Sequence, residues 1–280
     1  MVGNSGTKII SKEEKNIGEE LLKVDALTLP RKGEGYTLEN ISFSLKSGEI
    51  LGIYGLLGAG RTELLECLMG MHPESTGEIY LKGKKIIPKS IWGQIKKGFA
   101  LIPEDRQREG LVQVLSIAKN MTLASLWNYT KGFHLIDKKE NECITDKIKD
   151  LEIKVADRKL PILSLSGGNQ QKIVISKGIM TSPKILLLDE PSRGIDIGAK
   201  ADVFRIINKY ADQGLGIIVI SSELKEIIGI SDRVIVLSNG KLTGEFKGEE
   251  ITEEALIKAS AAGQVSKNSE KVIKASSKNS

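Results

Sequence analysis

The sequence predicts an α/β fold with a mainly parallel central sheet, and two features lead to that prediction. Five short apolar runs are nearly continuous, which is typical of strands covered on both faces of a sheet. Helical patterns lie between these runs, as the crossover connections of a parallel sheet require. The runs are residues 50–53, 99–102, 185–188, 217–220 and 234–237.

A helix and two hairpins are predicted around the first and last apolar runs. The helix covers residues 62–70, where leucines recur on one face. Residues 77–87 and 234–246 have the pattern of antiparallel hairpins. In the second hairpin Asn239 and Gly240 separate two strand-like stretches, and Asn-Gly is a strong signal for a two-residue turn.

A helical insertion is predicted between the second and third apolar runs. Residues from about Arg106 to Leu163 lack strong strand patterns, and helices are expected at Ser116–Tyr129 and Asp137–Leu151. We expect this helical subdomain to extend over about residues 106–168.

The two ends of the chain differ from the part between them. Residues 1–20 are polar and have little periodicity, so we expect a linker or terminal extension there. Residues 262–280 are rich in Lys, Ser and Asn and are expected to form a flexible tail. The folded domain is therefore expected over residues 21–261.

Composition excludes several classes of protein. Lys and Arg number 41 against 36 Asp and Glu, a net charge of +5 that is too small for a nucleic-acid-binding surface. Cys67 and Cys143 lie too far apart for a disulfide framework or zinc site. We expect both thiols to be reduced and buried, as in a cytoplasmic protein. No apolar run approaches the roughly 20 residues of a membrane-spanning helix, and no signal peptide is visible.

A glycine-rich loop follows the first apolar run and opens the predicted helix. It is close to the phosphate-loop template G-x4-G-K-[ST], in which backbone amides and the helix N-terminus bind phosphate. Thr62 would offer its hydroxyl to Mg²⁺. Arg61 stands where the template has Lys, and its larger, planar guanidinium is expected to handle a γ-phosphate poorly. A ligand-free Gly-rich turn is the alternative. The loop consists of Gly55, Leu56, Leu57, Gly58, Ala59, Gly60, Arg61 and Thr62.

Two acidic residues end the third apolar run. Asp189 is placed to coordinate Mg²⁺, directly or through water, and Glu190 to polarise an attacking water. Without the phosphate loop, two solvent-facing acids would be the default interpretation. Together the two motifs predict a nucleoside-triphosphate site.

The most specific feature is the signature segment, Leu165–Lys172, with the sequence LSGGNQQK. Ser166, Gly167 and Gly168 open a helix and combine a hydroxyl with an anion-binding helix terminus. The alternative is an ordinary Ser-capped helix start. A phosphate loop, an LSGGxQ segment and a strand ending in Asp-Glu occur in this order in few protein families.

The chain resembles the ATP-binding-cassette (ABC) ATPases over about residues 21–261. That resemblance implies a P-loop NTPase with a RecA-like parallel-sheet core, an antiparallel β subdomain and a helical signature subdomain, with ATP and Mg²⁺ as cofactors. In the family one domain's phosphate loop and a second domain's signature segment enclose the nucleotide. By resemblance the glutamine-loop segment is 101–106, the D-loop is 192–196 and the switch segment is 220–224.

Three positions depart from the family pattern around the γ-phosphate. Besides Arg61, Glu104 replaces the usual Gln and could still ligate Mg²⁺. Ser222 occupies the catalytic switch position, where most cassettes have His, and is too short to replace it. In the family, an aromatic residue before the phosphate loop stacks on the adenine ring. Tyr36 is the candidate for that role, with an exposed loop tyrosine as the alternative.

Trp92 and Trp127 are expected to be packing residues or part of a partner groove.

The mixed pattern is similar to the second, C-terminal cassette of the fused ATPase subunits of bacterial ribose, galactose and xylose importers. The matching blocks include IPEDRQREGLV and LLLDEPSRGIDIGAK. This resemblance implies half of a two-cassette subunit, peripheral on the cytoplasmic face of the plasma membrane. Its partners would be a second cassette, permease subunits and, indirectly, a sugar-binding protein, with no nucleic acid. Its signature segment would complete the partner's site, while its own site would be degenerate.

Three alternatives stay open at this point. One is a nucleoside importer of related architecture, and another is a non-catalytic cassette that senses ATP. The third is a DNA-repair or ribosome-associated ATPase. The short stretch between Thr62 and Ser166 argues against a repair protein, because it has no room for long coiled coils.

Overall fold

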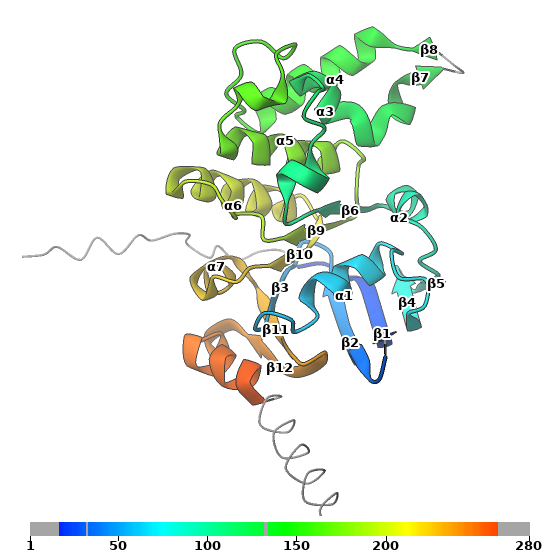
Figure 1. Cartoon of the computed structure of the whole chain (residues 1–280), viewed down its shortest axis with the longest axis vertical. Coiled ribbons are helices and arrows are strands. Elements are labelled where there is room, and N and C mark those ends of the chain that lie inside the picture. Colours follow the sequence, from blue (N-terminus) through cyan, green and yellow to red (C-terminus); the bar gives the residue numbers. More distant parts are fainter. Residues whose placement is uncertain (1–16, 32, 132–133, 263–280) are drawn as a thin grey trace, which may run out of the picture.

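The computed structural model describes residues 17–262, except 32, 132 and 133. Most of the expected N-terminal extension and nearly all of the expected tail lie outside the described residues. The chain forms a central parallel sheet with an antiparallel sheet on one side and a helical region above it (Figure 1). The predicted fold class is therefore confirmed. In the part that the structure describes, no helix is long and apolar enough to cross a membrane.

The central sheet has six strands in the order β12-β11-β3-β10-β9-β6. All neighbours are parallel except the hairpin β11–β12, which turns at Asn239-Gly240 as predicted. All five predicted apolar runs are strands of this sheet. The strands are β3 (Ile50–Tyr54), β6 (Phe99–Ile102), β9 (Ile185–Asp189), β10 (Gly216–Ile220), β11 (Arg233–Ser238) and β12 (Lys241–Lys247).

Alternate residues of the central strands enter two separate cores. On β10, Ile217 and Val219 pack in the core beneath the helices, while Ile218 and Ile220 pack in the core shared with the antiparallel sheet. Because both faces are buried, the strands need apolar residues at almost every position. The flanking helices are α1 (Arg61–Leu68), α2 (Ile91–Lys97), α5 (Gly167–Ile179), α6 (Ile197–Asp212) and α7 (Leu224–Ile230).

The second sheet is antiparallel, in the order β2-β1-β4-β5. The predicted hairpin at 77–87 supplies two of its strands, but the other two are long strands that the apolar pattern did not reveal. The strands are β1 (Glu20–Pro30), β2 (Tyr36–Lys46), β4 (Thr76–Leu81) and β5 (Lys84–Ile86).

A buried ion pair joins the two sheets. Arg233 on β11 donates from Nε to Oε1 of Glu49 at 2.7 Å and from Nη2 to the Ser44 carbonyl oxygen of β2 at 2.6 Å. The other Glu49 oxygen accepts from the backbone N–H of Lys46 at 2.7 Å. Glu49 is 3% exposed and Arg233 6%, so both charges depend on these contacts.

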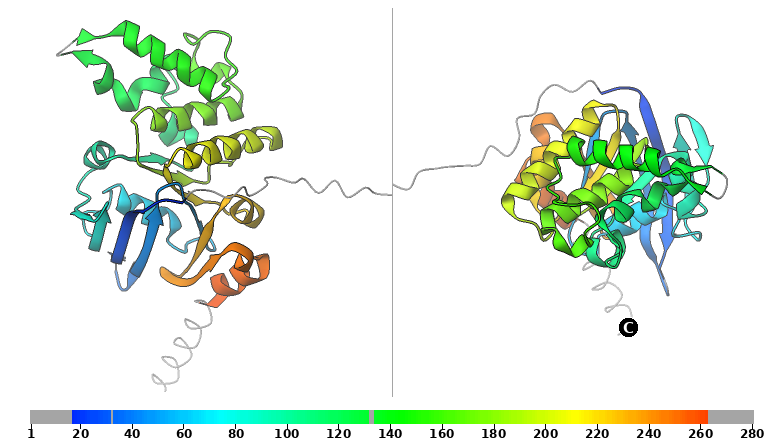
Figure 2. Two further views of the ribbon diagram at one scale, coloured as in Figure 1. Left: turned by 180° about the vertical axis from the view of Figure 1, so that it is seen from behind. Right: turned by 90° about the horizontal axis from the view of Figure 1, so that it is seen from above.

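The helical region differs in detail from the prediction. The single helix expected at Ser116–Tyr129 is an α-helix followed by a 3₁₀ segment, with a kink at Ser125. A two-stranded hairpin that was not predicted follows it (Figure 2, top of the left view). The elements are η1 (Arg106–Gly110), α3 (Ile117–Thr122), η2 (Leu123–Tyr129), β7 (Thr130–Lys131), β8 (His134–Leu135), α4 (Asp137–Asp150) and η3 (Ile162–Ser164).

Parallel register brings the predicted chemistry to one edge. Ile220 of β10 lies level with Ile53 of β3 and with Asp189 of β9. The phosphate loop, the Asp-Glu pair and the switch segment each begin where one of these strands ends. Carboxyl ends of parallel strands are the usual place for ligands in such sheets.

Candidate functional site

The phosphate loop curls tightly between β3 and α1. Gly58 and Gly60 have positive φ angles of 76° and 97°, which favour glycine. A Cβ on Gly60 would lie 2.7 Å from Cδ2 of Leu38, so the neighbouring β2 also requires glycine there. The resulting turn ends at the N-terminus of α1, where free amides and the helix dipole favour an anion. Tyr36 starts β2 two residues before Leu38 and is 51% exposed.

Thr62, the last residue of the phosphate loop, contacts Asp189 at the end of β9. The Thr62 hydroxyl donates to Oδ2 of Asp189 at 2.8 Å. Burial raises the pKa of Asp189 to about 6, and the charge of nearby Glu190 adds to that rise, although the Thr62 hydrogen bond opposes it. A hydroxyl and a carboxylate side by side fit Mg²⁺, whose remaining ligands would be phosphate oxygens and water. No group of three His, Cys, Asp or Glu side chains forms a metal site among the described residues.

This raised pKa predicts a pH-dependent Mg²⁺ site. Asp189 binds Mg²⁺ only when deprotonated, so Mg-ATP affinity should fall about tenfold between pH 7 and pH 5. Calorimetric titration across this range measures the change, with Mg²⁺-free ATP as the control for the nucleotide's own protonation. Asp189→Asn should flatten the Mg²⁺-dependent part of the profile. An unchanged slope in that variant would rule out Asp189 as the titrating group.

Arg61, the residue before Thr62, contacts the second acidic residue and the switch segment. Its guanidinium lies 3.5 Å from Oε1 of Glu190 and donates to Oγ of Ser222 at 3.2 Å. Ser222 also donates to Glu190 through its hydroxyl, and through its backbone amide at 3.0 Å. These three residues therefore form a closed polar cluster. Both oxygens of the carboxylate expected to polarise water are already hydrogen-bonded.

Glu190 has an unusual backbone conformation. Its φ angle is 46°, in the left-handed region that a residue with a side chain rarely adopts. Its amide donates to the Ile220 carbonyl oxygen at 3.0 Å, which helps to fix this conformation at the end of β9. Backbone conformations of this kind persist where the surroundings determine them and cluster at functional sites.

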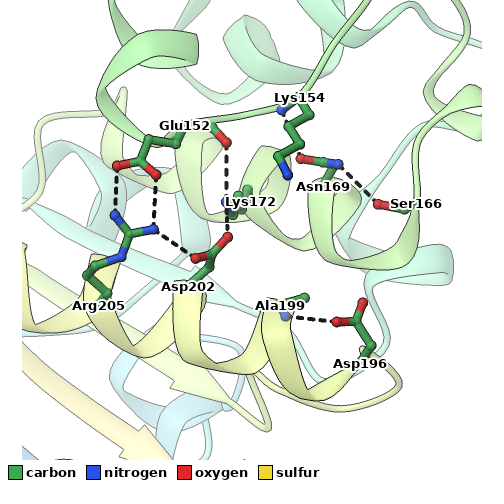
Figure 3. Close-up of polar contacts among 9 residues, drawn as sticks. All are labelled: Glu152, Lys154, Ser166, Asn169, Lys172, Asp196, Ala199, Asp202 and Arg205. Carbon is green, nitrogen blue, oxygen red and sulfur yellow. Dashed lines mark hydrogen bonds and ion pairs between the residues drawn. The ribbon is translucent and has the colours of Figure 1, made fainter.

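The signature segment presents Ser166 at an exposed helix start. Ser166 occupies the N-cap position of α5, but its hydroxyl caps no backbone amide. It instead accepts from Nδ2 of Asn169 at 3.0 Å, and Asn169 accepts from the Lys154 amide (Figure 3). A Cβ on Gly168 would lie 2.4 Å from Cβ of Ala199, so this glycine lets α5 start directly against α6.

Buried charge holds the signature helix in place. Lys172, which is 3% exposed, donates to Oδ2 of Asp202 on α6 at 2.6 Å. Arg205 binds Asp202 and both carboxylate oxygens of Glu152, at 2.7 and 3.0 Å to Glu152 (Figure 3). The signature segment is thus tied to α6, one of the helices that flank the central sheet.

The predicted site residues form two groups in the structure. One group is the phosphate loop with Asp189, Glu190 and Ser222, and the other is the signature segment. Within the described ranges, no hydrogen bond or ion pair joins the signature segment to the phosphate loop or to Glu190. Glu104, a predicted Mg²⁺ ligand, pairs with Arg193 of the D-loop and not with Thr62 or Asp189. Its role at the metal stays a prediction, as does the stacking role of Tyr36.

A buried carboxylate that the sequence analysis missed links the D-loop to the switch segment. Oε2 of Glu226 accepts from the hydroxyls of Ser192 and Ser221, each at 2.6 Å, and Oε1 receives Lys200 at 2.9 Å. Glu226 is only 6% exposed. Its place in a helical pattern after the switch segment gave no sign of this role, because both serine partners come from other segments.

Comparison with known proteins gives a family and several relatives. Residues 38–193 match the family model described as ABC transporter. The chain is 44% identical over 263 residues to the xylose import ATP-binding protein XylG of Escherichia coli (strain K12), and equally to that of Shigella flexneri serotype 5b (strain 8401). Each match covers 92% of this chain and 51% of the relative, so the chain spans about half the length of these proteins.

Solved structures share the fold at lower identity. The ATP-binding cassette MJ1267 of an ABC transporter gives a TM-score of 0.75 at 21% identity, covering 86% of this chain and 98% of that one. The cassette MJ0796 in a dimeric post-hydrolysis state, bound to ADP and Pi, gives a TM-score of 0.70 at 22% identity, with 81% and 98% covered. At these identities the likeness shows the fold alone.

Proposed function

The chain belongs to the ABC transporter family, and on that premise we propose that it is one cassette of a sugar importer's ATPase. It binds Mg-ATP and pairs with a second cassette to drive import of a monosaccharide through permease subunits. Its signature segment completes the partner's nucleotide site. Its own site binds nucleotide, but its hydrolytic activity in the isolated chain is weak or absent.

One observation carries the assignment of a degenerate site. The expected Mg²⁺ ligands Thr62 and Asp189 are present and in contact. Arg61 and Ser222, however, both contact the carboxylate of Glu190. Nucleotide binding depends mainly on loop amides and the helix terminus, which the structure retains. Turnover additionally needs a free base and groups that stabilise charge on the γ-phosphate. The described site therefore supports binding better than hydrolysis.

The signature side supports a contribution to a partner's nucleotide. Ser166 is exposed, makes no cap of its own helix and lies at the N-terminus of α5. Such a hydroxyl beside free helix amides suits an anion brought by another domain. MJ0796, which shares the fold, is dimeric with ADP and Pi bound, in line with pairing of cassettes. Nucleotide contacts present only in the closed pair would shift the population toward closure.

The sugar-import assignment rests on the XylG relatives and on the departures at Arg61, Glu104 and Ser222. We place the chain as the second cassette of its subunit, peripheral at the cytoplasmic face of the membrane. Xylose is the first sugar to test.

An exposed aromatic cluster suits a permease contact. Trp92 of α2, 53% exposed, meets Trp127 of η2 edge to face at 4.5 Å between ring centroids. Nζ of Lys96 lies 4.7 and 4.2 Å from the two ring centroids. The cluster bridges the core and the helical region, and exposed Ile91 extends its apolar surface. A permease helix with one apolar face and a carboxylate would complement it.

The experiment that tests this function begins with the chain alone. Mg-ATP should bind measurably by calorimetry, yet steady-state hydrolysis should not exceed that of Glu190→Gln, the matched blank. Turnover clearly above the blank, in folded protein, would contradict the degenerate site.

The pairing is tested in the assembled importer. Ser166→Arg should abolish sugar transport and ATP turnover, because the added bulk and charge block the surface that meets the partner's nucleotide. Ser164→Arg, exposed and close in sequence, is the control. Intact transport in Ser166→Arg would reject the completed-site model. Transport without any ATP-dependent pairing would instead favour a cassette that only senses nucleotide.

A further inference from the structure

The segment after β6 reaches the D-loop through Arg106. Its Nη1 donates to the Arg193 carbonyl oxygen at 2.7 Å, and its Nη2 donates to the Gly194 carbonyl oxygen at 2.9 Å. The planar guanidinium thus donates to two successive carbonyls in a fixed fork geometry that the ammonium of a lysine lacks. Its Nε is buried with no hydrogen-bond partner. The side chain therefore holds this position although one of its own donors stays unpaired.

The same guanidinium rests on the signature segment. A Cβ on Gly167 would lie 2.9 Å from Nη2 of Arg106 and 3.4 Å from the Gly194 carbonyl oxygen. The absent side chain of Gly167 therefore leaves the space that Arg106 fills. The next residue reinforces this contact, because Gln107 donates to Oε1 of Gln170 on α5 at 2.5 Å.

An ion pair also joins the segment 104–107 to the D-loop, but it is weaker. Glu104 pairs with Arg193, but the two side chains are 41% and 63% exposed, and exposed ion pairs contribute little. Arg106 is thus the main tie among the segment 104–107, the D-loop and the signature segment.

We propose that Arg106 is a positioning residue that fixes the D-loop relative to the signature segment, so that both meet a second cassette as one surface. The proposal deepens the function proposed above, because those two segments are the ones offered to the partner.

Hydrogen exchange on the full chain tests the positioning by itself. In Arg106→Ala, amides of residues 166–170 and 193–196 should exchange about tenfold faster, because the loops lose two charge-assisted hydrogen bonds. Arg106→Lys should behave like Arg106→Ala, since the charge remains but the fork is lost. Arg108→Ala, exposed on the same turn, is the matched control and should match the parent chain. Protection restored by Lys, or unchanged in Ala, would overturn the proposal.

Kinetics in the assembled importer test the consequence. Arg106→Lys should lower kcat for ATP hydrolysis about tenfold while the KM for ATP changes less than about twofold, because the variant disturbs alignment more than nucleotide binding. An unchanged kcat, or a rise in KM alone, would contradict alignment. If the parent chain itself shows no nucleotide-dependent pairing, the proposed function fails, and the exchange result still decides whether Arg106 fixes the two loops.

Discussion

Replacing Arg61 by Lys and Ser222 by His together is expected to raise Mg-ATP turnover of the chain to about 100-fold above the Glu190→Gln blank, measured as steady-state phosphate release. In the present arrangement the Arg61 guanidinium and the Ser222 hydroxyl and amide all contact Glu190. Lysine offers a compact charge to the phosphates, and histidine offers a ring long enough to reach a γ-phosphate. Oε1 of Glu190 would then be free to act on water, while Oε2 keeps its hydrogen bond from the backbone amide of residue 222.

Two control variants separate release of Glu190 from the added groups. Arg61→Ala removes the guanidinium without supplying an ammonium, so it should gain little. Glu190→Gln in the double-variant background should return turnover to the blank. The assay needs protein concentrations at which Mg-ATP-dependent association of the double variant is detected by light scattering. If associated double variant hydrolyses no faster than the parent, the side-chain contacts of Arg61 and Ser222 with Glu190 do not limit turnover.

The largest expected loss of stability follows from Glu49→Gln. Arg233 would keep its burial but lose its buried charged partner and retain only the ion pair with the exposed Glu245 at 3.3 Å. Removing one member of a buried pair costs about 3–5 kcal/mol. For a domain of this size, such a loss lowers the Tm by about 10 °C, which calorimetry can measure. Burial lowers the pKa of Arg233, but the hydrogen bond and charge of Glu49 outweigh it and leave that pKa raised. Arg233 therefore stays charged at any pH of the experiment.

Two variants distinguish a buried pair from an ordinary surface pair. Lys23→Met breaks the exposed contact with Asp25 and should change stability by less than about 1 kcal/mol. Replacing Glu49 and Arg233 together by Met should recover much of the loss, because no uncompensated charge remains. Equal effects of Glu49→Gln and Lys23→Met would show that the pair does not join the two sheets energetically.

The central strands were predictable because their burial on both faces leaves a local pattern of continuous apolar residues. Strands β1 and β2 carry no such simple pattern. Ala26 and Asn40 have positive φ angles, and the register shifts repeatedly along the pair, so their alternation is interrupted. The kink at Ser125 was likewise hidden, since an apolar helical pattern does not record where an α-helix tightens.

The candidate site divides in the same way. The phosphate loop, Thr62 with Asp189, and the exposed Ser166 follow from short motifs at predictable strand and helix ends. The contacts of Arg61 with Ser222, and of Arg106 with the D-loop, join residues far apart in the chain. A single sequence shows that Arg61 is unusual, but only the packed strands show which carboxylate it contacts.

The two adjacent serines of the switch segment have a consequence for how this site can diverge. Ser221 is 1% exposed and bound to Glu226, whereas Ser222 faces outward toward Arg61 and Glu190. The inner serine, Ser221, therefore helps to hold the switch segment in place. The outer one, Ser222, contacts the charged groups of the nucleotide site. Mutational drift can alter the outward residue, and with it the rate of hydrolysis, without loosening the loop. A cassette built in this way can lose its activity as an enzyme and still persist as a stable half of a working pair.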